Sequence, residues 1–422
     1  MGLRWSGSGF RLTVRLILAV AAMAACLGLV VYYHVPLPAR HLFPFPADKQ
    51  CAISITDDTD GFRLATTRPV YDLLDSLGLR ITRTTWIYDA PGHPPAQAGL
   101  SLANIAYRNW LLGEITRGHE ITLHSPSAGD DTRERILAAH DTLRHLVGHP
   151  ASLEIFHSDN KEALYWGADR LPNPILRAVY RRIRHARFEG AKPGSPYYWS
   201  DISRSLVRYV RGYTFNEVNT LRLNPDMPYM DSRTPGAPLW FANSNGRTPR
   251  AMLRLLSPEN VAKLKKQRGA CIIYTHLADG FSDQLPGGGG VVAPQIRALF
   301  RRVGTDPGVE FVPAGELLDR LRVIQLLEDA QQSNRRAVSI PSELMHAIDG
   351  ISAAGDLAKP GTPGEGGKGR TPGRESLRAW LEAHQIRCEV GGDVFAEPRE
   401  IGSEERWRLT LRWVITQFVS PT

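Results

Sequence analysis

Two adjacent aspartates, Asp57 and Asp58, follow a short apolar run and are residues whose type and spacing favour catalysis. The apolar run, residues 51–55, predicts a buried strand. Because side chains alternate along a strand, the two carboxylates are expected to diverge. One of them can then bind a metal ion while the other acts as a general base. A solvated acidic turn over residues 58–61 is the alternative that this stretch alone leaves open.

Three histidines favour the catalytic interpretation because each comes at the end of a strand-like apolar run. They are His124, His157 and His276. A single histidine in such a place is more often a hydrogen-bonded structural residue. Three runs that end in histidine and one that ends in two aspartates predict a common site. Imidazole and carboxylate ligands with an open position for water suit a zinc-like ion.

The elements that must position these residues alternate in type along the chain. Strands are predicted at 51–55, 80–88, 121–123, 152–156, 270–274 and 309–312, and helices at 68–77, 102–116, 132–147, 293–302 and 317–327. Repeated strand–helix alternation predicts an α/β fold with a parallel sheet, either closed into a barrel or doubly wound. In a barrel, catalytic groups collect at the carboxyl ends of the strands.

The motifs around these residues resemble those of one known family, the polysaccharide deacetylases of the NodB-homology type (carbohydrate esterase family 4-like). The similar stretches are Asp57-Asp58, the Gly-His-Glu-Ile sequence that begins at Gly118 and leads to His124, and Thr275-His276. The resemblance spans roughly residues 51–327 and is that of a divergent, uncharacterised branch. It implies a distorted (β/α) barrel, in agreement with the alternation of strands and helices.

The resemblance also implies roles for single residues. Asp57 would be the general base, Asp58 and His124 metal ligands, and His276 the general acid. The metal is expected to be a divalent ion, zinc above all. The expected reaction is hydrolysis of N-acetyl or O-acetyl groups on a cell-envelope polysaccharide or glycan.

The sequence departs from the family pattern at the metal site. Four residues after His124, where the family has another metal-binding histidine, stands Ala128, and the arginine-proline motif that orients the base has no clear match. We hypothesise that His157 supplies the missing ligand. The alternative is a catalytically degenerate, metal-free protein that binds glycans or acts as a scaffold on the deacetylase fold. Glycoside cleavage is a third, less favoured possibility, because it needs two carboxylates across a sugar ring and only one adjacent pair is evident.

Several residues after the second and third histidine motifs are candidates for contacts with a sugar. Aromatic faces can stack on the C–H surfaces of a pyranose, and polar groups can bind hydroxyls or orient histidines. The candidates are Tyr165, Trp166, Trp199, Asn160, Glu162 and Asp201. Core packing, helix capping and surface ion pairs are the alternative roles for each of them.

The N-terminal residues predict a single-pass membrane protein. Residues 16–33 carry no charge, and their length is at the lower edge of a transmembrane helix. Arg4, Arg11 and Arg15 precede them, so the positive-inside rule keeps the N-terminus in the cytoplasm and exports the main domain to the periplasm or the cell exterior. A cleaved signal peptide is the main alternative.

Composition predicts how the rest of the chain is divided. The expected parts are a cytoplasmic tail and anchor (1–35), a Pro-rich spacer (36–49), a deacetylase-like barrel (50–330), a Gly/Pro-rich linker (331–374) and a small C-terminal unit (375–422). The net charge of +8 is spread along the chain without a dense Lys/Arg stripe. The expected partners are therefore an acetylated glycan and the membrane, and no nucleic acid.

The cysteines do not suggest a disulfide framework. Cys51 and Cys271 lie in strand-like apolar runs and are expected to be two buried thiols, with a Cys51–Cys271 disulfide as the alternative. No CxxC spacing suggests a cysteine zinc site.

Overall fold

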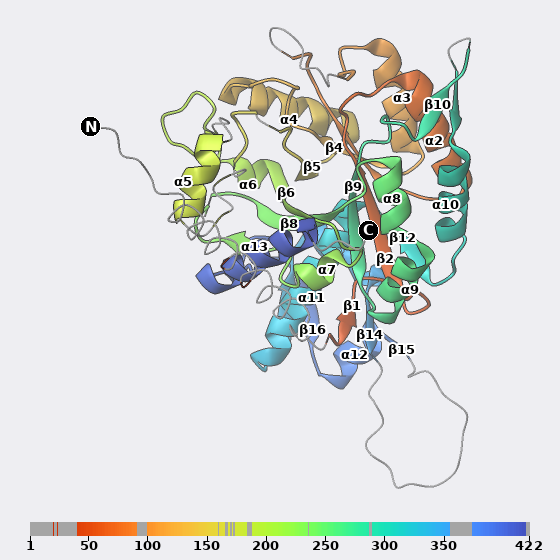
Figure 1. Ribbon diagram of the computed structural model, residues 1–422. Coiled ribbons are helices and arrows are strands. Elements are labelled where there is room, and N and C mark those ends of the chain that lie inside the picture. The colour runs from red at the N-terminus through yellow and green to blue at the C-terminus, as the bar shows by residue number, and fades with distance from the viewer. Residues whose placement is uncertain are drawn as a thin grey trace, which may run out of the picture.

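The centre of the molecule is a closed barrel of parallel strands. The structure is a computed structural model that describes Val20, Met23 and residues 40–90, 99–158, 160–164, 168, 171, 174–183, 188–234, 236–286, 289–354 and 374–418. In the barrel, the strands follow the order β2-β3-β4-β5-β6-β8-β9, and β9 pairs back with β2 (Figure 1). Their bounds are β2 Cys51–Asp57, β3 Thr82–Thr85, β4 Glu120–Leu123, β5 Ala151–Glu154, β6 Val207–Phe215, β8 Leu239–Asn245 and β9 Ala270–Thr275. The expected (β/α) barrel is confirmed.

Strand β2 has three neighbours. It pairs with β9 from Ala52 to Asp57 on one side. On its other side β12 (Val309–Phe311) pairs with its first residues, and β3 pairs with its last two, Thr56 and Asp57. This arrangement anchors the strand that ends in the aspartate pair.

The helices predicted between the barrel strands are present within a few residues of their expected bounds. They are α2 Leu64–Ser76, α3 Ile105–Thr116, α4 Arg133–Val147, α10 Pro294–Gly304 and α11 Ala314–Gln332. Further helices are α5 Pro174–Ile183, α6 Ser203–Leu206, α7 Thr220–Leu223, α8 Pro249–Leu255 and α9 Pro258–Lys266. Three of them, α8, α9 and α10, begin with proline, whose fixed φ suits the first helical position and whose missing N–H is not needed there.

The two faces of β2 pack in different layers. Ile53 and Ile55 lie in one apolar cluster with Val70 and Tyr71 of α2, which covers the outside of the barrel. Because neighbouring side chains alternate, Ser54 and Thr56 point to the opposite face. Asp57 therefore continues the face of Ile53 and Ile55, toward the helix layer.

Strands β6 and β8 were not predicted. β8 follows a Pro-rich stretch, and β6 contains Arg211 and Gly212 within its apolar residues, so neither has a simple strand pattern. Both are completed by their neighbours in the barrel, with a register irregularity between Arg211 and Thr214.

Segments from both ends of the described chain pack against the barrel domain. Strand β1 (Leu42–Phe43), in the expected spacer, pairs with β14 (Ser352–Ala354), which also pairs with β15 (Arg374–Ser376). Helix α13 (Ser403–Phe418) contacts β6, where the hydroxyls of Tyr213 and Thr410 lie 3.0 Å apart. The other elements are β7 Met230–Asp231, β10 Ser282–Gln284, β11 Gly290–Val292, β13 Ala337–Ile340, η2 Ser342–Gly350, α12 Leu377–Ala383, β16 Arg387–Val390 and β17 Glu400–Ile401.

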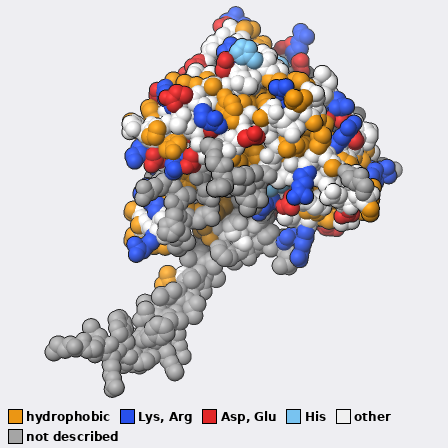
Figure 2. All heavy atoms as spheres, turned by 90° about the horizontal axis from the view of Figure 1, so that it is seen from above, with side chains coloured by type: hydrophobic (Ala, Val, Ile, Leu, Met, Phe, Trp, Pro, Cys, Tyr) orange, Lys and Arg blue, Asp and Glu red, His pale blue; other side chains and the backbone are white. Residues whose placement is uncertain are grey.

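The expected anchor, residues 16–33, lies outside the described residues except for Val20 and Met23. Within the described part of the chain, no helix is long and apolar enough to cross a membrane. On the face seen in Figure 2, described basic and acidic side chains are interspersed with apolar ones.

The two strand cysteines are free and buried, as predicted. Burial raises the pKa of the Cys51 thiol and of the Cys271 thiol to about 12.

Candidate metal centre

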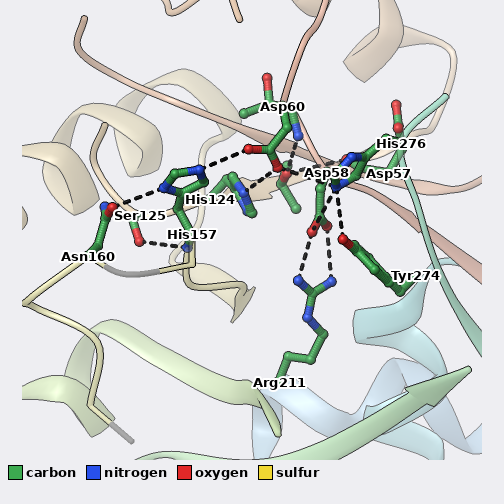
Figure 3. Close-up of polar contacts among 12 residues, drawn as sticks. Asp57, Asp58, Asp60, His124, Ser125, His157, Asn160, Arg211, Tyr274 and His276 are labelled. Carbon is green, nitrogen blue, oxygen red and sulfur yellow. Dashed lines mark hydrogen bonds and ion pairs between the residues drawn. The ribbon is translucent and has the colours of Figure 1, made fainter. Parts of the chain in front are cut away.

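Three histidines converge on Asp60 at the carboxyl ends of the barrel strands (Figure 3). The Nε2 atoms of His124 and His157 each lie 3.0 Å from a carboxylate oxygen of Asp60, one on Oδ2 and the other on Oδ1. The Nε2 atom of His276 lies 3.4 Å from Asp60 Oδ2. The structure thus brings the three strand-end histidines together, as the sequence pattern indicates, around an aspartate that follows the predicted pair.

A tight turn after β4 helps to place two of these histidines. Ser125, directly after His124, has a left-handed backbone with φ of 54°. Its hydroxyl accepts a hydrogen bond of 3.2 Å from the backbone N–H of His157. The ends of β4 and β5 are held together in this way, and the His124 and His157 rings have centroids 5.5 Å apart.

A chain of buried hydrogen bonds sets the orientation of His157. The side-chain nitrogen of Asn160 donates to the carbonyl of Ser127 and to Glu162 Oε1, at 3.0 and 2.7 Å. The Oδ1 atom of Asn160 is therefore an acceptor, and His157 Nδ1–H donates to it over 3.0 Å. The Nε2 atom of a neutral His157 then has its lone pair free toward Asp60.

Asp58 belongs to the same cluster but is also paired with an arginine. Ligand atoms of Asp58, Asp60 and His124 lie within 4.8 Å of one another, so these three residues could hold a metal ion. Arg211 on β6 donates two hydrogen bonds to Asp58, of 3.1 Å to Oδ1 and 2.7 Å to Oδ2. His276 Nε2 lies 3.9 Å from Asp58 Oδ2. The Asp58 carboxylate thus faces the histidines while an arginine fixes its plane.

Asp57 lies apart from this cluster. Its Oδ2 accepts hydrogen bonds from Arg83 Nη1 at 2.5 Å and Tyr71 Oη at 2.9 Å, and its Oδ1 accepts one of 2.7 Å from the Leu277 N–H. Its side chain is fully buried on the side of the helix layer. The two aspartates diverge as predicted, but the expected role of Asp57 as the base does not fit this position, because strand alternation turns Asp58 and not Asp57 toward the histidines.

The neighbouring charges govern ionisation in the cluster. Burial raises the pKa of Asp60, but His124 and His157 outweigh burial and hold that pKa well below its usual range. Burial lowers the pKa of His157, and Asp60 more than reverses this effect, so the net shift is upward. Burial lowers the pKa of His276, and Asp58 and Asp60 offset it only in part. An anionic Asp60 is therefore present at neutral pH.

The donor set fits a divalent cation. A carboxylate and two imidazoles, from Asp60, His124 and His157, are the ligand types of zinc-like sites. The hydrogen bond from His157 Nδ1 to Asn160 is the outer contact that metal-binding histidines commonly make. Ala128, at the family's usual ligand position, is a buried alanine without donor atoms.

The expected sugar-binding residues are not gathered in one place. Trp199 is fully buried, and its indole N–H donates to the Glu162 carbonyl over 2.8 Å, so it offers no face to a sugar. Asp201 forms a two-pronged ion pair with Arg133, at 2.6 and 2.9 Å. Tyr165 and Trp166 lie outside the described residues.

Glu162 and Asn160 support His157 rather than an open surface. Both are buried, and Asn160 connects Glu162 to the His157 ring. Burial raises the pKa of Glu162 to about 8. Orienting a histidine was one of the two roles considered for Glu162.

Sequence reasoning missed Asp60 and Arg211 as members of the cluster. Asp60 lies two residues after Asp58 and was attributed to an acidic turn. Arg211 had a detectable signal, a charged residue in the middle of an apolar strand. Both open onto one region of the molecule: a cavity of about 380 Å³ is lined by Asp60, Gly61, Arg63, Thr66, Arg247, His276, Ala278 and Asp279.

Comparison with known proteins finds likeness only in fold. No family model and no curated protein matches the sequence. Among solved structures, a putative polysaccharide deacetylase from Mycobacterium smegmatis is similar with a TM-score of 0.39 and 12% identity, over 69% of this chain and 96% of that one. A probable polysaccharide deacetylase from Pseudomonas aeruginosa PAO1 has a TM-score of 0.37 and 11% identity, over 69% and 95%. The peptidoglycan deacetylase PdaC from Bacillus subtilis has 0.32 and 14%, over 68% and 97%.

These solved structures are of the class that the sequence motifs resemble. With identities of 14% or less and TM-scores of 0.39 or less, the function of this chain rests on the residues of its own site.

Proposed function

We propose that the chain is a metal-dependent hydrolase that removes N-acetyl or O-acetyl groups from a cell-envelope glycan, carried by an exported and membrane-anchored domain. The observation that supports this proposal is the convergence of three strand-end histidines on Asp60 beside the Asp58–Arg211 pair. A divalent ion, zinc in the first place, would be held by Asp60, His124 and His157, and would act as a Lewis acid toward the acetyl carbonyl.

The remaining polar residues divide the proton transfers. Asp58, held by Arg211, accepts the proton of the attacking water. His276 donates a proton to the leaving nitrogen or oxygen, and its Nε2 lies 3.1 Å from the hydroxyl of Tyr274. In this assignment Asp58 takes the role expected for Asp57, and Asp60 the role expected for Asp58. Asp57 instead stabilises the outer layer through Arg83.

Paired substitutions test the assignment. Asp58→Asn should lower kcat for acetate release by about 10²- to 10⁴-fold, the range of general base catalysis, while zinc still binds. Asp57→Asn should mainly lower the free energy of unfolding, by roughly 3–5 kcal/mol, because it leaves the buried Arg83 without its charged partner. Acetate release from acetylated oligosaccharides, zinc content and denaturant unfolding are measured on both variants.

Each outcome discriminates between named roles. Loss of zinc in Asp58→Asn would make Asp58 a ligand, as first expected. Loss of turnover in a folded, zinc-loaded Asp57→Asn would restore Asp57 as the base. A protein that binds oligosaccharides but neither binds zinc nor releases acetate would be the degenerate glycan-binding protein, and the proposal would be rejected.

A further inference from the structure

Two arginines line the cavity that opens beside Asp60 and His276. Arg63 directly precedes helix α2, and Arg247 follows strand β8, so both come from loops next to the candidate metal centre. Arg63 is exposed, whereas Arg247 is partly buried. Neither residue has a role in the proton transfers proposed above.

Arg247 differs from the other arginines near the barrel axis. Arg83 and Arg211 are paired with Asp57 and Asp58, at 2.5 and 2.7 Å. The Nε atom of Arg247 is buried and has no hydrogen-bond partner, and its guanidinium forms no ion pair with a described carboxylate. A buried donor without a partner is costly, so a site that retains one is suited to an acceptor supplied by a ligand.

The first turn of α2 adds positive potential to the same cavity. Thr66, in that turn, lines the cavity with Arg63. The first turn contains no acidic residue, and no side chain caps the helix. Helix N-termini favour anions because of their free N–H groups and the helix dipole. Besides Asp60 in the metal centre, the acidic residue of the lining is Asp279, which is exposed at the rim.

We propose that Arg247 and Arg63 bind an anionic group of the substrate, so that the substrate is an acidic glycan whose carboxylate or phosphate lies close to the acetyl group. A guanidinium recognises either group with two parallel hydrogen bonds. This inference rests on the proposed deacetylase function and adds the substrate class to it.

Matched substrates test the inference. The first is an acetylated acidic oligosaccharide, and the second is the same oligosaccharide after chemical reduction of its carboxylates to alcohols. The wild-type protein should have a kcat/KM about 10-fold or more higher for the acidic form, the effect of one charge-assisted contact. Arg247→Gln should lower that ratio to about 1–3, and Arg63→Gln should lower it less, because Arg63 is exposed. A phosphorylated oligosaccharide of the same length distinguishes a phosphate from a carboxylate site.

The control is Arg250→Gln, which removes the same charge three residues away, on the exposed face of α8. It should leave the substrate ratio within about 2-fold of the wild type. Arg247→Lys, which keeps the charge but not the two-pronged geometry, serves if Arg247→Gln unfolds.

Binding of the deacetylated acidic oligosaccharide, followed by calorimetry, tests the same contacts without turnover. Weaker binding to Arg247→Gln than to Arg250→Gln supports the inference even if no acetate is released. Equal kcat/KM for both substrates, or equal binding by the two variants, overturns the acidic-substrate inference and leaves the deacetylase function intact. Absence of acetate release from every substrate overturns the proposed function instead.

Discussion

Two groups of acidic and histidine side chains have atoms close enough to share a metal ion, and they differ in what surrounds them. One is Asp58, Asp60 and His124 at the strand ends, and the other is Asp75, Glu114 and His119 in the outer layer. Their residue types are almost the same. The comparison shows that ligand type and proximity do not suffice, because the hydrogen bonds on the far side of each histidine and the nearby cations decide whether a metal is needed.

The outer group is already neutralised. Arg80 lies 3.0 Å from Asp75, and Arg117 lies 2.9 Å from Glu114. His119 Nδ1 accepts a hydrogen bond of 3.2 Å from the Ile81 N–H, so its proton is on Nε2, which donates to Asp75 over 3.0 Å. A protonated Nε2 has no lone pair for a metal.

In the strand-end group the histidine chemistry is reversed. His157 donates from Nδ1 to Asn160, which leaves Nε2 available, and three Nε2 atoms share the single Asp60 carboxylate. Arg211 pairs with Asp58 but not with Asp60 in the described contacts. We therefore expect zinc in the strand-end group and not in the outer group.

The largest expected effect comes from removing one central carboxylate from each group. Asp60→Asn should weaken zinc binding by much more than the roughly 100-fold that the loss of an outer contact can cost. Asp75→Asn should leave zinc affinity within a few-fold of the wild type. Competition with a fluorescent chelator measures both affinities, and equal losses in the two variants would end the distinction between the groups.

A smaller effect is expected from the support of His157. Asn160→Ala removes the acceptor of His157 Nδ1–H and should lower zinc affinity about 10- to 100-fold without removing a ligand. Asn104→Ala is the matched control, because Asn104 caps helix α3 by accepting from the Tyr107 N–H and lies outside the cluster. That change should cost about 1 kcal/mol of stability and leave zinc affinity unchanged. Unaltered affinity in Asn160→Ala would mean that His157 is not a ligand.

The smallest effect concerns the outer group and pH. Burial, with Asp75 nearby, raises the pKa of Glu114 from 4.5 to about 7. Because the folded state holds this proton more tightly, the contribution of Glu114 to stability falls as the pH rises from about 4.5 to 7. Glu114→Gln removes that loss, so its stability relative to the wild type should increase by about 1–3 kcal/mol between pH 5 and pH 8.

Urea unfolding at both pH values measures this difference. Glu382→Gln, at an exposed glutamate of α12, should show no such increase. An equal pH response in the two variants would show that Glu114 is not desolvated. A zinc ion bound to the outer group would instead make the pH response depend on chelator.

The local pattern of the chain was sufficient for the elements and for part of the site. Runs of apolar residues of strand and helix length predicted β2, β4, β5 and β9 and the helices between them, because each buries its own periodic face. Histidines directly after such runs were correctly expected near one another, since parallel strands present their carboxyl ends at one edge. Strand β6 escaped prediction because Arg211 interrupts its pattern, and its reason is a partner 153 positions away in the sequence.

Only the closed barrel decided which aspartate does what. Alternation along β2 requires Asp57 and Asp58 to face opposite ways, but which way each faces depends on the side that α2 covers. Arg83 and Arg211 come from different strands, and each takes the aspartate that points to it. Asp60 becomes central because the ends of β4, β5 and β9 deliver three histidines to it. These distances join residues far apart in the chain, and no local pattern contains them.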